Sequence, residues 1–254
     1  MQTYLDTILS ITKDAANIPR KHFRAGVDVA YKSDASPLTV ADQGTEAFIR
    51  EALEQHFPDH GILGEEFAER TGSSAFQWII DPIDGTRSFI SGMPLYGMLA
   101  GLLEHGIPVL GVVRMPELDE VFTGDGTRAT LNGAPIKVAE TTRLDQAMLY
   151  INEADKLMRD EPAVFARLNT SARDRRFSYD CYPHALLAAG HIDVCVDYDL
   201  KPFDILALVP VITGAGGVIS DWQGQDLGLG SDGRVLSAAT PALHAQMLDV
   251  LNAG

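Results

Sequence analysis

The segment WIIDPIDGT spans residues 78–86 and carries the most informative order of apolar, acidic and turn-forming residues in the chain. Trp78-Ile79-Ile80 predicts a buried strand that ends at Pro82 and has Asp81 at its end. Asp84 can return to the same side, and Gly85-Thr86 opens a turn or helix with free backbone N–H groups. Two carboxylates beside free amides suit a divalent cation bound next to a phosphate. The same aspartates could also simply cap a turn, since Asp-Pro and Asp-Gly are common turn dipeptides.

Several other charged residues are candidates for the same site, and each also has an ordinary structural explanation. Gly64-Glu65-Glu66 follows a short apolar strand, although adjacent glutamates are usually a solvated surface pair. Asp204 precedes an apolar helix, where an N-cap is its ordinary role. Thr39 and Asp42 stand three apart at a predicted helix start and form a variant capping box. Lys32, taken alone, would be interpreted as an ordinary charged residue of a loop. In combination, these residues point to one acidic site.

Outward from these residues, the pattern divides the chain into two halves, 1–140 and 141–254. The first half predicts two helices followed by a mainly antiparallel sheet, and the second alternates strands and helices as in a layered α/β arrangement. In the first half, helices are predicted at 5–16 and 40–57, and strands at 61–63, 78–80, 95–113 with a hairpin tip at 105–106, 121–123 and 129–131. In the second half, strands are predicted at 147–151, 194–196, 218–220 and 235–237, and helices at 160–168, 185–189, 205–213 and 241–251.

Composition restricts the possible partners. The net charge is 20 − 35 = −15, which disfavours binding to nucleic acid or to an anionic membrane. A phosphate substrate is also an anion, so cations or a local basic patch must reverse the field at its site. Cys181 and Cys195 fit neither a disulfide framework nor a metal motif and predict buried free thiols in a reducing compartment. We find no signal-peptide pattern and no membrane-length apolar run, so we expect a cytoplasmic protein.

Taken together, four segments resemble the inositol monophosphatase family. They are Asp34-Ala35-Ser36-Pro37-Leu38-Thr39-Val40-Ala41-Asp42, Gly64-Glu65-Glu66, the whole of WIIDPIDGT, and Pro202-Phe203-Asp204 followed by Gly214-Ala215-Gly216-Gly217. They occur in the family's order and roughly its spacing, over about residues 5 to 250. The resemblance implies a layered α-β-α-β-α sandwich made of two fused halves, usually a homodimer. It also implies an enzyme that removes phosphate from a small phosphate monoester with two or three Mg²⁺ ions.

The resemblance assigns the metal ligands. Glu65, Asp81, Asp84 and Asp204 match the family's ligand carboxylates, and Ile83 matches a ligand through its backbone carbonyl. Asp84 and Asp204 are also expected to touch the substrate. Hard oxygen ligands are those that Mg²⁺ prefers, which explains a site built from Asp and Glu rather than from His or Cys.

The resemblance also assigns the residues that act on water and phosphate. Asp42 and Thr86 match the pair that orients the water nucleophile, with Glu65 beside them as a catalytic carboxylate. Gly85 and Thr86 are expected to offer backbone amides to the phosphate. Lys32 matches the lysine of a mobile loop at the mouth of the site, where it would contact the substrate.

Within the family, the second half is most similar to the histidinol-phosphate phosphatase branch. The similarity lies in residues 180–182, 186–193, 200–211 and 216–222, and in 86–92 of the first half. Asp180 and Asp197 would face the organic part of the substrate, where acidic groups favour the cationic amine and imidazole of L-histidinol phosphate. Two positions depart from the branch. Ser178-Tyr179 replaces two glycines, and Asp197 replaces a glutamate.

These departures leave the substrate open. They fall on the wall that would contact the organic group, so inositol 1-phosphate or another sugar-alcohol phosphate is an alternative substrate. An alternative of another class is an inactive regulatory protein that binds metal and phosphate without turnover. Such a protein would tolerate the loss of a ligand or nucleophile residue, whereas this chain keeps the full set.

Overall fold

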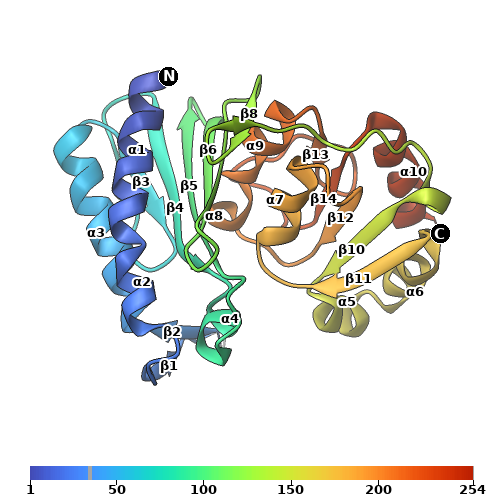
Figure 1. Ribbon diagram of the computed structural model, residues 1–254, viewed down its shortest axis with the longest axis horizontal. Coiled ribbons are helices and arrows are strands. Elements are labelled where there is room, and N and C mark those ends of the chain that lie inside the picture. The colour runs from blue at the N-terminus through green and yellow to red at the C-terminus, as the bar shows by residue number, and fades with distance from the viewer. Residues whose placement is uncertain (34–35, 254) are drawn as a thin grey trace.

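Sheets and helices alternate in five layers in the computed structural model, which describes residues 1–33 and 36–253 (Figure 1). The order across the molecule is helix, sheet, helix, sheet, helix, so the predicted α-β-α-β-α sandwich is confirmed. Asp34 and Ala35, which open one of the segments of family resemblance, lie outside the described residues.

The first helical layer covers the outer face of the first sheet. It contains α1 (Gln2–Ala15), α2 (Asn17–His22) and α3 (Val40–His56), which confirms the two predicted amphipathic helices. Their apolar side chains, among them Ile8 and Leu53, pack on Trp78 and Ile80 of the sheet. Because burial of such side chains is the main favourable term in folding, this face fixes the position of the sheet's buried strands.

The first sheet, seven-stranded within the described residues, has the order β3-β4-β5-β6-β7-β8-β9, with β3 parallel to β4 and every other neighbouring pair antiparallel. A separate antiparallel pair of strands, β1 (Val29–Tyr31) with β2 (Pro37–Thr39), precedes it. The strands of the sheet are β3 (Gly61–Gly64), β4 (Phe76–Asp84), β5 (Gly97–Glu104), β6 (Ile107–Met115), β7 (Glu120–Gly124), β8 (Ala129–Leu131) and β9 (Ala134–Pro135).

One expectation for this sheet was wrong. The strand of the WIIDPIDGT segment does not end at Pro82 but continues to Asp84 as β4. The register with β5 shifts between Asp81 and Asp84, and an irregularity of this kind is where a strand tolerates a proline that cannot donate a ladder hydrogen bond. The Ile83 N–H donates to Asp81 Oδ1 at 3.0 Å instead of to the ladder. The irregularity therefore builds the turn that the proline was expected to begin.

The second sheet has the order β11-β10-β12-β14-β13, with β10 parallel to β11 and β12 and with antiparallel pairs β12-β14 and β13-β14. Its strands are β10 (Met148–Asn152), β11 (Asp174–Ser178), β12 (Val194–Asp197), β13 (Val218–Ser220) and β14 (Val235–Ala238). Four of these confirm predicted strands, whereas the edge strand β11 was not expected. The outer helices α5 (Ala154–Asp160), α6 (Pro162–Ser171) and α10 (Pro241–Asn252) cover its far face (Figure 1).

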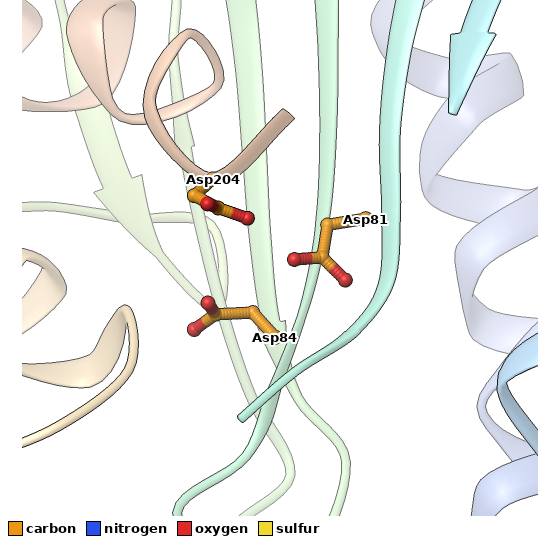
Figure 2. A group of neighbouring side chains, drawn as sticks. All are labelled: Asp81, Asp84 and Asp204. Carbon is orange, nitrogen blue, oxygen red and sulfur yellow. The ribbon is translucent and has the colours of Figure 1, made fainter. Parts of the chain in front are cut away.

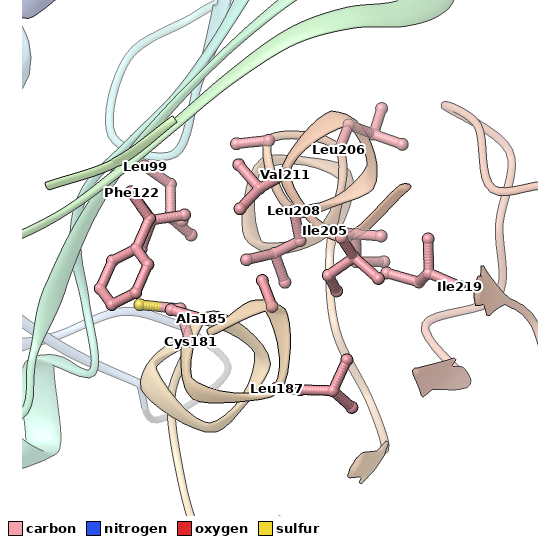
Figure 3. Close-up of a cluster of buried hydrophobic side chains, with 14 of the residues drawn as sticks. Leu99, Phe122, Cys181, Ala185, Leu187, Ile205, Leu206, Leu208, Val211 and Ile219 are labelled. Carbon is pink, nitrogen blue, oxygen red and sulfur yellow. The ribbon is translucent and has the colours of Figure 1, made fainter. Parts of the chain in front are cut away.

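The central layer lies between the two sheets and contains α7 (Tyr182–Ala188), α8 (Pro202–Ile205) and α9 (Leu208–Gly214). Figure 3 shows its side chains, such as Ile205 and Val211, in one buried cluster with Leu99 and Phe122 of the first sheet. A single helix was predicted over 205–213, but the chain forms two short helices there. The first of them, α8, presents Asp204 at the end of β4.

The strands of the first sheet all precede residue 136, and those of the second all follow residue 147. The division of the chain into units 1–140 and 141–254 stays a prediction, since the central buried cluster takes residues from both sides of it. Among the helices that the structure describes, none combines the length and the apolar character needed to cross a membrane.

Candidate active site

Three aspartates from two distant parts of the chain meet at the lower end of β4. Asp81 and Asp84 come from β4 and Asp204 from α8, and one carboxylate oxygen of each lies within 4.8 Å of those of the other two (Figure 2). Asp81 and Asp84 are 1% and 9% exposed. The register shift in β4 is what allows two aspartates three residues apart to face the same point. The structure thus brings together three of the four expected metal-ligand carboxylates.

Electrostatics make this cluster a fitting place for a divalent cation. Burial raises the pKa of Asp81, and repulsion from Glu65, Asp84 and Asp204 raises it further. Burial likewise raises the pKa of Asp84, with the charges of Asp180 and Asp204 adding to it. Burial is also the main reason that the pKa of Asp204 rises to about 7. Carboxylates this close repel one another unless they are protonated or share a cation, and their hard oxygens suit Mg²⁺.

Glu65, the fourth expected ligand, lies next to the cluster after the end of β3. Lys32 Nζ lies 2.8 Å from Glu65 Oε1 and 2.9 Å from Glu66 Oε1. Burial raises the pKa of Glu65, and the ammonium of Lys32 opposes that rise. For Lys32 itself, burial lowers the pKa, but the hydrogen bonds to both glutamates outweigh it and the pKa is raised. Lys32 therefore stays charged at the side of the acidic site.

Asp42 and Thr86 form the expected pair. Thr86 Oγ1 donates to Asp42 Oδ1 at 3.1 Å and lies 3.3 Å from the carbonyl oxygen of Ile83. The other carboxylate oxygen of Asp42 accepts from Thr39 N at 2.8 Å, in the predicted capping box of α3. The cap and the pair expected to orient water are thus one arrangement, in which the start of α3 fixes the carboxylate that accepts from Thr86.

Gly85 connects β4 to the short helix α4 (Thr86–Ser91) and has a positive φ of 90°. A Cβ atom on Gly85 would lie 2.4 Å from Cγ of Asp180, so a side chain would collide with that carboxylate. Asp180 also accepts a hydrogen bond from Ser88 Oγ. Burial raises the pKa of Asp180 to about 6. The structure therefore places Asp180 directly beside the amides expected to bind phosphate.

Asp197 was expected to face the organic part of the substrate. In the structure it is 2% exposed, and both of its carboxylate oxygens make hydrogen bonds inside the protein. Oδ2 accepts from Asn152 Nδ2 at 2.7 Å and meets His184 Nε2 at 3.1 Å, and Oδ1 accepts from Tyr198 N at 2.8 Å. An aspartate is one methylene shorter than the glutamate usual in the branch, and here its carboxylate bonds to interior groups.

Two further acidic residues near the site were missed from the sequence. Glu46 of α3 is buried, and its carboxylate accepts from Glu66 N at 2.7 Å while pairing with Arg50 at 2.6 Å. The spacing of Glu46 and Arg50, four apart on a helix, was the available signal, but such pairs usually lie on surfaces. Glu153 follows β10 with a φ of 47° and pairs with Lys156 at 2.7 Å. In addition to burial, the charge of Glu153 raises the pKa of Asp180.

Comparisons with known proteins agree with this geometry. The sequence profile described as "Inositol monophosphatase family" matches residues 1–253. The chain is 38% identical over 247 residues to "Bifunctional phosphatase IMPL2, chloroplastic" of Arabidopsis thaliana. This match covers 93% of this chain and 71% of that protein. It is 35% identical over 254 residues to "Histidinol-phosphatase" of Chlorobaculum parvum, covering 98% and 97%.

A solved structure shows the same fold at useful identity. An inositol monophosphatase from Zymomonas mobilis superposes with a TM-score of 0.89 at 35% identity, over 98% of each chain. With the acidic cluster at the end of β4, these similarities show that the chain is a metal-dependent phosphomonoesterase that belongs to the inositol monophosphatase family.

Proposed function

We propose that this phosphatase hydrolyses L-histidinol phosphate. The observation that carries the proposal is the acidic wall beside the phosphate-binding turn, where Asp180 packs against Gly85. Burial raises the pKa of Tyr179, the residue before Asp180, and the charges of Asp155 and Glu153 raise it further. Acidic groups beside an aromatic ring suit a ligand whose organic part carries a cationic amine and an imidazole. The similarity to the Chlorobaculum parvum protein named histidinol-phosphatase supports the same substrate.

The metal site we propose uses the oxygens of Glu65, Asp81, Asp84 and Asp204 and the carbonyl of Ile83 for two or three Mg²⁺ ions. Bound Mg²⁺ would neutralise the phosphate, lower the pKa of a water molecule and stabilise the leaving oxygen. The buried carboxylates, whose pKa values are raised by burial and mutual repulsion, fit this donor set.

The chain's own groups would handle the water and the phosphate. Asp42 and Thr86 orient the attacking water, with Thr86 Oγ1 hydrogen-bonded to Asp42 and able to turn a lone pair toward the water's proton. The amides of Gly85 and Thr86 bind phosphate oxygens, and Lys32 adds a positive charge at the edge of the site. Water adds to phosphorus, the ester P–O bond breaks, and the products are inorganic phosphate and the alcohol.

A second candidate substrate is inositol 1-phosphate or a related sugar-alcohol phosphate. It is favoured by Ser178-Tyr179, which replaces the glycines usual in the histidinol branch, and by the 35% identity to the Zymomonas mobilis inositol monophosphatase. The experiment that decides is a side-by-side measurement of kcat/KM for both esters at saturating Mg²⁺. We expect the value for L-histidinol phosphate to be higher by at least about ten-fold. A higher value for inositol 1-phosphate would overturn the substrate proposal.

We also propose that the protein is a cytoplasmic homodimer. The dimer rests on the family resemblance alone. The compartment rests on the two thiols of Cys181 and Cys195, both buried and free. Sedimentation equilibrium across micromolar concentrations would test the dimer, and a concentration-independent monomer mass would contradict it.

A further inference from the structure

A single peptide group links the metal site to the interior of the second sheet. This is the peptide between Asp180 and Cys181. Its N–H, on Cys181, donates to Asp84 Oδ2, and its carbonyl, on Asp180, accepts from Asn152 Nδ2 at 3.0 Å. Because a peptide unit is planar and stiff, a bond that fixes its carbonyl also fixes the direction of its N–H. Asn152 and Asp84 therefore hold opposite ends of one rigid group.

The conformation of this turn requires support. Asp180 has a φ of 65°, in the left-handed region that a residue with a side chain adopts at a cost. Its carboxylate is held by Ser88, but its main chain is held on the interior side by Asn152. Loss of the Asn152 bond would free the peptide to rotate and turn its N–H away from Asp84.

Asn152 is itself oriented by Asp197. Asn152 ends β10 and is completely buried, and its Nδ2 donates to Asp197 Oδ2 at 2.7 Å as well as to the Asp180 carbonyl. These two bonds use both protons of the amide and fix which of its atoms faces the turn. The Asp197 carboxylate is therefore a fixed acceptor that aims the Asn152 amide at the Asp180–Cys181 peptide.

His184 completes the arrangement. It lies on α7, directly after the turn, and is completely buried. Its Nε2 lies 3.1 Å from Asp197 Oδ2 and its Nδ1 lies 2.8 Å from Ser237 Oγ on β14. Since a carboxylate only accepts, Nε2 carries the proton, and the Ser237 hydroxyl can then donate to Nδ1. The imidazole thus ties Asp197 to the helix that begins where the turn ends.

We propose that Asn152, Asp197 and His184 are positioning residues that act on the metal site through the Asp180–Cys181 peptide and the Asp84 carboxylate. The inference rests on the metal role proposed for Asp84. It gives Asp197 a function different from contact with the substrate, because its carboxylate holds the turn from behind. Hydrogen bonds to a ligand carboxylate fix its orientation, and loss of such outer partners typically lowers metal affinity by about 10- to 100-fold.

The test compares Mg²⁺ binding to the full chain by isothermal titration calorimetry, without substrate, and follows it with kcat/KM for p-nitrophenyl phosphate. Asn152→Ala should weaken Mg²⁺ binding by at least about ten-fold and lower kcat/KM. His184→Ala should do the same, and His184→Gln should recover part of the affinity, since the glutamine amide can still donate to Asp197.

The matched control is Ser220→Ala. Ser220 is a buried serine on β13 of the same sheet, paired with His244 Nε2 at 2.7 Å, and it makes no bond to the Asp180–Cys181 turn. It should lower the free energy of unfolding and leave Mg²⁺ affinity at the wild-type value. If Asn152→Ala and both His184 variants also keep wild-type Mg²⁺ affinity, the three residues are only structural and the inference is wrong.

Failure of one alanine variant to fold would not hide the answer, because Asn152→Ala and His184→Ala interrupt the same series of hydrogen bonds at different residues. Wild-type Mg²⁺ affinity in whichever of these two alanine variants folds contradicts the proposal. Neither result depends on the substrate, so an error in the histidinol phosphate proposal would show separately, as poor turnover of that ester by wild-type protein with normal Mg²⁺ binding.

Discussion

Thr86 Oγ1 lies 3.1 Å from Asp42 Oδ1 and donates to it, joining the start of α4 to the start of α3. Asp42 is completely buried and is held on its other oxygen by Thr39, so it cannot turn away from Thr86. Burial raises the pKa of Asp42, while the hydrogen bonds from Thr39 and Thr86 oppose the rise. The two side chains are therefore held in fixed positions, which the orientation of an attacking water requires.

Removal of the Thr86 hydroxyl should therefore affect catalysis more than binding. Thr86→Ala should lower kcat by about 100-fold or more while KM changes little, because the hydroxyl acts on the attacking water rather than on the ester. Thr86→Ser is the matched control and should retain most activity, since it keeps the hydroxyl. Steady-state kinetics measure both constants, and a change in KM alone would show that Thr86 serves binding or capping.

Gly85 is expected to tolerate no side chain. Gly85→Ala would place a Cβ atom 2.4 Å from Asp180 Cγ and should lower kcat/KM by at least about 100-fold. Gly106→Ala is the matched control, since Gly106 has a similar positive φ of 81° but nothing within 4 Å of the added atom. Both substitutions should lower the free energy of unfolding by about 1 kcal/mol through the left-handed backbone. Equal activities in the two variants would show that the close approach of Asp180 to Gly85 does not affect catalysis.

Asp180 should discriminate between substrates. Asp180→Asn removes a negative charge beside the phosphate turn and should lower kcat/KM for L-histidinol phosphate by about 5- to 100-fold, the range for one charge-assisted hydrogen bond. Hydrolysis of inositol 1-phosphate should change little. Asp6→Asn, at an exposed position of α1 on the far side of the first sheet, is the control for net charge. Equal losses on both esters would make Asp180 a support for the site.

Asp197→Asn should behave differently from Asp180→Asn. The Asp197 carboxylate acts from inside the protein through Asn152, so its loss should lower kcat/KM for both esters by similar factors. The measurement is the ratio of the two kcat/KM values in wild type and variant. A selective loss on L-histidinol phosphate would instead place Asp197 in contact with the organic group.

The grouping of Asp81 with Asp84 and the cap formed by Thr39 and Asp42 could be predicted because short segments of sequence carry them. The order of Asp81, the proline and Asp84 in WIIDPIDGT is local, and the cap of Thr39 and Asp42 spans a single helical turn. The error about Pro82 arose because a proline in a strand normally ends the ladder, whereas here a register shift absorbs it.

The elements that were missed give no periodic signal. β11 is an edge strand, and its residues Asp174, Arg175 and Arg176 are exposed, so apolar alternation is absent. α5 is seven residues long and buries only Ala154 and Leu157. A helix of this length shows too few turns for a 3.6-residue pattern to be recognised.

The supporting residues could not be found from the sequence because tertiary contacts define them. Asn152 meets Asp197 across 45 positions and Asp180 across 28. In the sequence, Asn152 is only a polar residue at a strand end, and Asp197 is only an acidic residue where the branch has glutamate. Their interior bonding appears only when β10 and β12 are placed side by side.

Stability without metal should depend on pH in a direction fixed by the raised pKa values. Asp81, Asp84, Asp180 and Asp204 all have pKa values above the ordinary 3.8, with about 6 for Asp180 and about 7 for Asp204. The folded protein therefore binds more protons than the unfolded chain between about pH 4 and pH 7, and these groups' contribution to stability is lost as pH rises through that window.

Mg²⁺ should reverse this loss, because a cation replaces the protons that the carboxylates release. The Tm with Mg²⁺ at about 10 mM should exceed the Tm with EDTA. This difference should be larger at pH 8 than at pH 5.5. Thermal unfolding followed by circular dichroism measures it. An equal increase in Tm at both pH values would mean that Mg²⁺ does not bind at the aspartates whose pKa values are raised.

The central claim is that the carboxylates of Asp81, Asp84 and Asp204 hold the metal on which phosphate hydrolysis depends. Asp84→Asn keeps the size and the hydrogen bond from Cys181 N while it removes one anionic ligand. The most direct measurement is calorimetric titration of Mg²⁺ into wild-type protein and Asp84→Asn, with kcat for p-nitrophenyl phosphate at saturating Mg²⁺. We predict Mg²⁺ binding weakened by at least about ten-fold and kcat lowered by at least about 100-fold in a variant that still folds. Near-normal kcat and Mg²⁺ affinity in Asp84→Asn would contradict the account.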